Sequence, residues 1–155
     1  MPSYKGHLLG SFCAYTITIF FISLGLPSWH ISASRHAEWL LCTLLGGLFP
    51  DIDIKSKAQK LFYRIMFFAV CFFIIQKKFY VLAGLALFAC VPLMVKHRGL
   101  LHNSMFIICL LGTIVIATIF FMPAATELVV KDAFFFLLGA LSHIWLDFSF
   151  KRVIR

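Results

Sequence analysis

Long runs of apolar residues, separated by short polar stretches, set the pattern along this chain. Six runs are candidates for membrane-spanning helices, because a spanning helix needs about 20 mostly apolar residues. The second and third runs are short for a full crossing, and Arg64 interrupts the third, so we expect tilt, snorkelling or partial re-entry there. The six predicted spans are Leu8–Leu26, Glu38–Phe49, Leu61–Ile75, Phe79–Val95, Met105–Met122 and Ala133–Phe150.

The amino-acid composition excludes an ordinary soluble domain. Hydrophobic residues make up 62% of the 155 residues, and charged residues only 13%. Soluble domains average about 45–50% apolar residues, with glycine included, and about 25% charged residues. The connections between the runs are only a few residues long, which leaves little chain for a soluble domain. The sequence therefore predicts an all-α, polytopic transmembrane helix bundle of about six helices, forming a single integral membrane domain over residues 1–155.

The basic residues carry information about orientation. The chain has 14 Lys and Arg residues against 6 Asp and Glu residues, and the basic ones lie in short clusters between apolar runs. If the N-terminus is cytoplasmic, ten of the 14 fall on the cytoplasmic side and four on the other, in line with the positive-inside rule. We therefore expect both termini in the cytoplasm, the lipid bilayer as the surrounding medium, and no nucleic-acid partner.

Three short polar motifs contrast with this apolar background. A carboxylate at the centre of a spanning helix costs about 2.5–3.5 kcal/mol on insertion scales, so acids and histidines in such chains usually have a partner or a function. In the last motif, the i, i+4 spacing of His143 and Asp147 puts both on one helix face. The motifs are Pro50-Asp51-Ile52-Asp53 after the second run, His97-Arg98-Gly99-Leu100-Leu101-His102 between the fourth and fifth runs, and Ser142-His143-Ile144-Trp145-Leu146-Asp147 in the sixth.

The six-span topology brings these motifs to one face of the membrane. The end of the second span, the loop after the fourth and the C-terminal half of the sixth all lie toward the cytoplasm, as does the start of the first. Imidazole and carboxylate groups together suit a divalent cation, zinc above all, which binds both at about 2.0–2.2 Å. The predicted metal ligands are His7, Asp51, Asp53, His97, His102, His143 and Asp147.

Seven candidate ligands exceed the four positions of one tetrahedral zinc shell. Either two ions are bound, with Asp51 and Asp53 as bridging ligands, or some carboxylates orient the histidines that bind a single ion. Arg98 is the one guanidinium in the set, and its planar fork suits a phosphate or carboxylate group of a substrate. We therefore expect Asp51, Asp53 and Arg98 to take part in catalysis.

Each motif also has a simpler interpretation when it is taken alone. Pro50 and Asp51 fit a turn and a helix N-cap. The loop from His97 to His102 fits a contact with anionic lipid headgroups. Hydrogen bonds between helices would account for His143 and Asp147. The remaining acids and histidines are expected to be solvated loop residues near the opposite face; they are His30, His36, Glu38, Glu127 and Asp132.

Taken together and in this order, the motifs resemble the YdjM-type family of bacterial inner-membrane proteins, which are described as membrane-bound metal-dependent hydrolases. The resemblance spans nearly the whole chain, and it includes Gly6-His7 near the N-terminus and Gly139 before the last motif. The chain departs from the family pattern at Ile54, where His often follows Asp-Ile-Asp, and at Leu101 and Asn103, which replace hydroxyl residues. The resemblance implies a metal site and a location in the bacterial inner membrane.

These features lead to the hypothesis of a membrane-bound, metal-dependent hydrolase with a His/Asp site at the cytoplasmic face. A bound zinc ion would lower the pKa of its water from about 16 to about 7 and polarise the bond to be cleaved. The general base would be whichever carboxylate stays uncoordinated. The position of the site at helix ends favours a phospholipid or another lipid-linked substrate.

Three other functions fit part of the pattern. A metal-ion or proton transporter also uses buried His and Asp, but its polar residues would extend through the bilayer rather than gather on one side. An intramembrane zinc protease would carry a His-Glu-x-x-His pair, which the sequence lacks. In a structural interaction protein, the polar cluster would only join helices and would hold no metal. The sequence indicates no surface for a protein partner.

Overall fold

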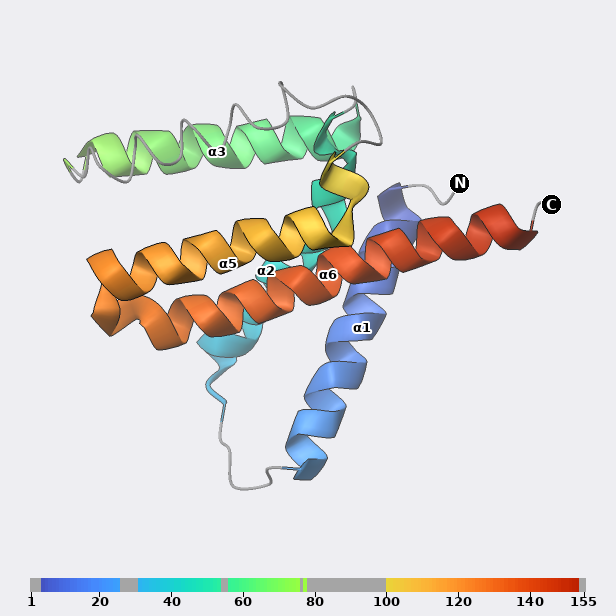
Figure 1. The fold of residues 1–155 in the computed structure, drawn as a ribbon, viewed down its shortest axis with the longest axis horizontal. Coiled ribbons are helices and arrows are strands. Elements are labelled where there is room, and N and C mark those ends of the chain that lie inside the picture. Colours follow the sequence, from blue (N-terminus) through green and yellow to red (C-terminus); the bar gives the residue numbers. More distant parts are fainter. Residues whose placement is uncertain (1–3, 26–30, 54–55, 76, 78–99, 154–155) are drawn as a thin grey trace.

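Helices make up the regular structure of the described part of the chain. The computed structural model describes residues 4–25, 31–53, 56–75, 77 and 100–153 (Figure 1). Within these ranges it has five α-helices, three short 3-10 helices and no strand, which confirms the predicted all-α bundle. The predicted span Phe79–Val95 lies outside the described residues. The α-helices are α1 (Tyr4–Gly25), α2 (Ala33–Leu48), α3 (Lys57–Ile75), α5 (Ser104–Phe121) and α6 (Thr126–Val153), and the 3-10 helices are η1 (Phe49–Asp53), η2 (Leu100–His102) and η3 (Pro123–Ala125).

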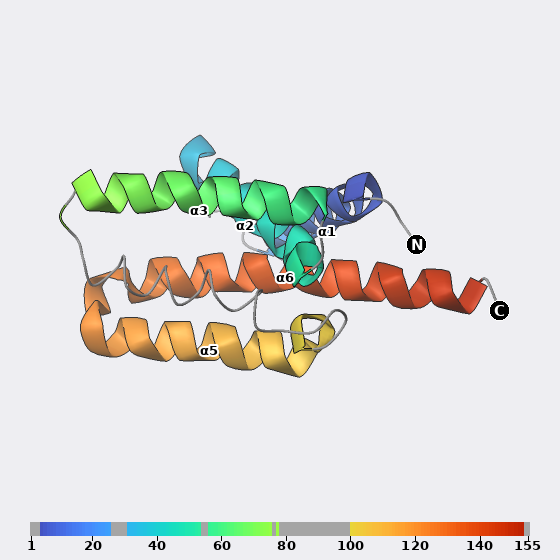
Figure 2. The ribbon, with the colours of Figure 1, turned by 90° about the horizontal axis from the view of Figure 1, so that it is seen from above.

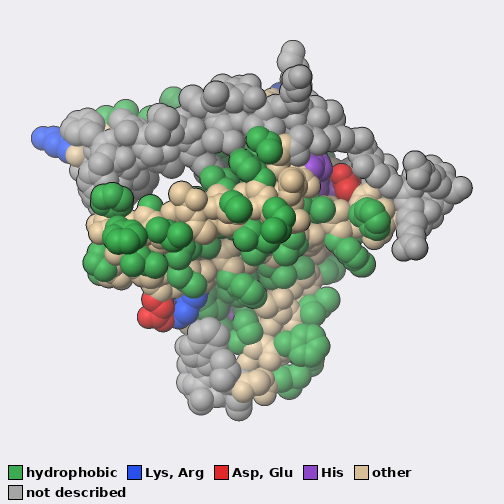
Figure 3. All heavy atoms as spheres, in the orientation of Figure 1, with side chains coloured by type: hydrophobic (Ala, Val, Ile, Leu, Met, Phe, Trp, Pro, Cys, Tyr) green, Lys and Arg blue, Asp and Glu red, His purple; other side chains and the backbone are tan. Residues whose placement is uncertain are grey.

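Among the described residues, three helical segments are long and apolar enough to cross a membrane: Tyr4–Gly25, Ser104–Phe121 and Pro123–Ser149. Among the described residues, apolar side chains lie along much of the face seen in Figure 3 and outnumber the charged ones, and Phe121 on α5 is 85% exposed. Hydrocarbon is a better medium than water for such a surface. Helix α2, with 16 residues, is about 24 Å long and so falls short of the roughly 30 Å hydrocarbon core, as its short apolar run predicts.

The last helix begins earlier than its apolar run. We predicted a start at Ala133, but α6 begins at Thr126, directly after η3. Lys131 and Glu127 form an i, i+4 ion pair at 2.6 Å that stabilises the first turns. The expectation that Glu127 lies in a loop is therefore wrong. Asp132 is also helical and partly buried, and its Oδ1 atom has no hydrogen-bond partner in the described structure.

The polar residues near the start of the second run are also helical. Glu38 lies in α2 beside Arg35, with which it forms an ion pair. His36 lies in the same helix, and its Nδ1 atom is 2.9 Å from the Tyr15 hydroxyl of α1. These contacts, rather than solvent alone, surround the two side chains, so the expectation of solvated loop residues is wrong for both. His30 lies outside the described residues.

Helix α6 is the central element, since α1, α2 and α5 all pack against it. Helix α5 runs antiparallel beside α6, and α1 crosses α6 at a steep angle (Figures 1 and 2). Helices α2 and α6 approach most closely where glycines face backbone. A Cβ atom at Gly139 would overlap the Thr43 carbonyl oxygen, and one at Gly46 would overlap that of Phe136. Small residues permit this kind of backbone approach between membrane helices.

Two apolar clusters hold the helices in register. One joins α1, α2 and α6 through Tyr15, Trp39 and Phe135. The other contains Ile52 of η1 and Leu101 of η2, which are 1% and 0% exposed. Burial of these two side chains fixes both 3-10 helices against α5 and α6. Asp51 and His102, which are adjacent to them in the sequence, are therefore positioned beside α6.

Candidate metal centre

Five polar side chains from four separate parts of the chain meet beside the C-terminal half of α6. Two groups of potential metal ligands have their donor atoms within 4.8 Å of one another: His7, His143 and Asp147, and Asp51, His102 and His143. The side chains of His7 and His143 are 3% and 0% exposed, and those of Asp147, His102 and Asp51 are 12%, 15% and 24% exposed. The centre is therefore closed on the α1 side and open on the side of η1 and η2.

The distances between imidazole and carboxylate groups fit metal coordination better than direct hydrogen bonding. His143 Nε2 lies 3.6 Å from Asp51 Oδ1 and 3.9 Å from Asp147 Oδ2. His102 Nε2 lies 3.8 Å from an oxygen of each carboxylate. Hydrogen bonds of this type end near about 3.2 Å, whereas two ligand atoms on one tetrahedral zinc ion are about 3.4 Å apart. The donor set thus fits a divalent cation in both chemistry and spacing.

A backbone hydrogen bond selects the form of His143 that can bind a metal. Its Nδ1 atom lies 2.7 Å from the carbonyl oxygen of Gly47, and a carbonyl oxygen only accepts, so Nδ1 carries the proton. In the neutral ring, Nε2 then presents its lone pair toward the carboxylates. This atom is buried and has no hydrogen-bond partner in the described structure. Metal-binding histidines are commonly oriented by such a bond from the second ring nitrogen.

The orientation of His143 depends on close packing beneath it. A Cβ atom at Gly47 would overlap the hydroxyl of Ser11 in α1. The Ser11 hydroxyl donates to the His7 carbonyl oxygen at 2.9 Å and lies 3.1 Å from the Ser142 hydroxyl. We did not identify Gly47 and Ser11 from the sequence. The available signal was the recurrence of small residues in three apolar runs, which is typical of close helix contacts in membranes.

Replacing Gly47 by alanine is expected to destabilise the protein through Ser11. Overpacking of this kind typically costs about 1–3 kcal/mol. Ser11→Gly removes the overlapping group, so the double variant should lose less stability than the sum of the two single variants, by about 1–2 kcal/mol. Thermal unfolding in detergent, followed by tryptophan fluorescence, measures all three. Strict additivity would show that the Ser11 contact is not the cause.

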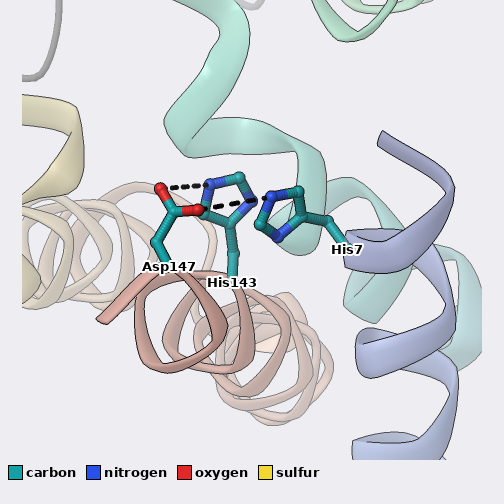
Figure 4. Close-up of side chains that lie close together, drawn as sticks. All are labelled: His7, His143 and Asp147. Carbon is teal, nitrogen blue, oxygen red and sulfur yellow. Dashed lines mark ion pairs between the residues drawn. The ribbon is translucent and has the colours of Figure 1, made fainter. Parts of the chain in front are cut away.

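The structure brings together five of the seven predicted ligands. Asp53 ends η1, but its side chain lies outside the described part of the chain, as do residues His97 and Arg98. Figure 4 shows the three of the five that come from α1 and α6: the rings of His7 and His143 lie face to face, and the Asp147 carboxylate faces their edges.

The capping role suggested for Asp51 is filled by other residues. At the start of α3, the Ser56 hydroxyl accepts from the Gln59 N–H at 3.1 Å and donates to the Asp51 carbonyl oxygen. Asn103 caps α5, since its side chain accepts from the Met105 N–H at 2.9 Å. A capping role thus accounts for Asn103, where the family pattern has a hydroxyl residue. The carboxylate of Asp51 is directed at the histidines instead.

Comparison with known proteins gives this centre a family context. No curated protein and no solved structure matches the chain. A family model does match, and it extends over residues 1–154, which include every element that carries a candidate ligand. This match confirms the resemblance drawn from the sequence motifs. The chain is a membrane protein and belongs to the YdjM inner membrane protein family.

Proposed function

We propose that the protein is a metal-dependent hydrolase that binds zinc, or a similar divalent cation, through Asp51, His102 and His143. The observation that carries this proposal is the buried Nε2 atom of His143, which is oriented by Gly47 and directed at carboxylates beyond hydrogen-bonding distance. An unsatisfied buried polar atom costs about 1–3 kcal/mol, and coordination removes that cost. Packing of helices alone gives no reason to keep such an atom.

Hydrolysis is the chemistry that this donor set supports. Three protein ligands leave one position of a tetrahedral shell open, as in catalytic zinc sites. A zinc ion held by these residues would supply a bound water with a pKa of about 7 and would polarise the bond under attack. The proton of the attacking water would pass to a carboxylate that stays uncoordinated, as expected from the sequence. Asp53 and Arg98 keep the catalytic roles expected from the sequence, with Arg98 as the contact to a substrate anion.

A lipid or lipid-linked substrate suits the place of the centre in the molecule. Its open side is formed by η1 and η2, where Asp51 and His102 are partly exposed. Trp145, between the two ligand residues of α6, is 67% exposed, and Phe148 is 66% exposed. Tryptophan is enriched where membrane helices meet the headgroups. The charge pattern favours the cytoplasmic leaflet for this end, and a phospholipid head from that leaflet would then reach the centre.

Asp51→Asn tests the proposed function while keeping the size of the side chain. We expect purified wild-type protein to contain zinc and to hydrolyse phosphatidylglycerol or phosphatidylethanolamine in mixed micelles, and we expect the variant to be slower by at least about 100-fold. Elemental analysis and mass spectrometry of the products measure the two properties. Asp132→Asn is the matched control, because this acid also lies in a membrane helix but outside the centre.

Two results would reject the hydrolase. Wild-type protein without zinc, purified in the absence of chelators, would remove the basis of the proposal. Zinc uptake into proteoliposomes that requires His143, without product from any lipid, would assign ion transport instead.

A further inference from the structure

The two most deeply buried imidazoles of the centre cannot serve one ion. The rings of His7 and His143 are stacked, with centroids 3.7 Å apart and planes inclined by only 16°. A metal ion lies close to the plane of an imidazole that binds it, at about 2.0–2.1 Å from the nitrogen. Because the two ring planes are nearly parallel, they intersect much farther from the ring nitrogens than the length of a metal–nitrogen bond. A single ion therefore cannot lie in both ring planes.

The carboxylate of Asp147 presents one oxygen to each ring. Its Oδ1 atom lies 3.6 Å from His7 Nε2, and its Oδ2 atom lies 3.9 Å from His143 Nε2 (Figure 4). Both distances exceed a hydrogen bond and leave room for an ion between nitrogen and oxygen. Paired ions in hydrolytic sites are about 3.5–4 Å apart, and the stacking distance of the rings falls within this range.

We propose that the centre binds two divalent cations, with Asp147 as the bridging ligand and His7 as the terminal ligand of the second ion. This proposal rests on the metal binding of the proposed function and goes beyond it. It replaces Asp51 and Asp53 by Asp147 as the bridge, since Asp51 Oδ1 approaches His102 and His143 but Asp147 reaches both stacked rings.

The two ions are held unequally. The first has His143, His102 and Asp51 in addition to the bridge, so its water takes a fifth position, which catalytic zinc can accept. The second has only His7 and the bridge among the described residues. The supporting bonds also differ, because His143 donates to the Gly47 carbonyl oxygen, whereas His7 Nδ1 has no hydrogen-bond partner in the described structure. The second ion therefore dissociates first.

Metal stoichiometry tests the second site without any assay of activity. Full-length protein in detergent is loaded with Zn²⁺ or Mn²⁺ and analysed for metal per chain. We expect two ions in the wild type and one in His7→Ala, and stepwise dialysis against a chelator should release one ion from the wild type at least about 10-fold more readily than the other. His36→Ala, a histidine at the other end of the bundle, should keep both ions. If circular dichroism shows that His7→Ala does not fold, His7→Gln replaces it in the same measurement.

Electron paramagnetic resonance of the Mn²⁺ form tests the bridge. A carboxylate bridge couples the two ions, so the wild type should give an exchange-coupled spectrum, and His7→Ala should give that of an isolated Mn²⁺ ion. One ion per chain in both proteins would overturn the second site while leaving the proposed function intact. Two ions in His7→Ala, or two uncoupled ions in the wild type, would overturn the assignment of His7 or of the bridge. A metal-free wild type would instead reject the proposed function itself.

Discussion

His143→Ala is expected to lower the affinity of the protein for zinc by more than about 100-fold, the largest effect of any single ligand. Loss of a residue that merely supports a ligand typically costs 10- to 100-fold in metal affinity, and His143 belongs to both groups of potential ligands. The variant also removes the ring that stacks on His7 and the partner of the Gly47 carbonyl oxygen. Competition with a chromophoric chelator in detergent measures the affinity.

Thermal unfolding gives an independent measurement of the same change. Zinc at about 100 times its dissociation constant stabilises a protein that binds it only when folded by about 2.7 kcal/mol. The wild type should therefore melt at a higher temperature when zinc is added, and His143→Ala should not. His36→Ala is the control, since His36 contacts Tyr15 and lies outside both ligand groups. A zinc-dependent rise of equal size in His143→Ala would contradict the assignment of this residue as a ligand.

The meeting of the candidate ligands could be predicted because helix direction alternates along a polytopic chain. In the predicted six-span topology, connections two spans apart return to the same side of the membrane, which would place Asp51 and His102 together. The i, i+4 spacing then puts His143 and Asp147 on the face that receives them. None of these steps requires knowledge of how the helices pack, so the pattern of apolar runs was sufficient to predict that these residues meet.

The arrangement within the centre depends on packing that no residue encodes alone. The tautomer of His143 follows from the Gly47 carbonyl oxygen, and that contact requires α2 and α6 to be separated by little more than their backbones. The stacking of His7 on His143 depends in turn on how α1 crosses α6. These distances follow from several small residues acting together across three helices, whereas the sequence shows each of them separately.

The start of α6 shows a different limit of hydropathy. The apolar run begins at Ala133 because Lys131 and Asp132 are charged, yet the helix continues back to Thr126. The backbone hydrogen bonds of a helix form whether its side chains are polar or apolar. The ion pair between Glu127 and Lys131 stabilises the additional turns. Hydropathy thus located the part of the helix that suits the bilayer, while local pairing and the preceding η3 decided where the helix begins.

Gly139→Ala is expected to destabilise the fold by about 3 kcal/mol, near the upper end of the usual cost of overpacking. The added Cβ would overlap the backbone oxygen of Thr43, and a backbone oxygen cannot rotate away as a side chain can. Helices α2 and α6 must therefore separate, which moves the Gly47 carbonyl oxygen away from His143 Nδ1. Zinc affinity should fall together with the melting temperature, although Gly139 is not a ligand.

Gly112→Ala in α5 is the matched control for this prediction. A Cβ atom at Gly112 meets nothing within 4 Å, so alanine there should keep or raise stability by up to about 1 kcal/mol through its better helix propensity. Thermal unfolding in detergent and zinc competition are measured for both variants. If Gly139→Ala has the same melting temperature and the same zinc affinity as Gly112→Ala, close contact between α2 and α6 is not what orients His143. A fall in both properties in Gly139→Ala alone would instead tie the metal centre to the glycine contact between these helices.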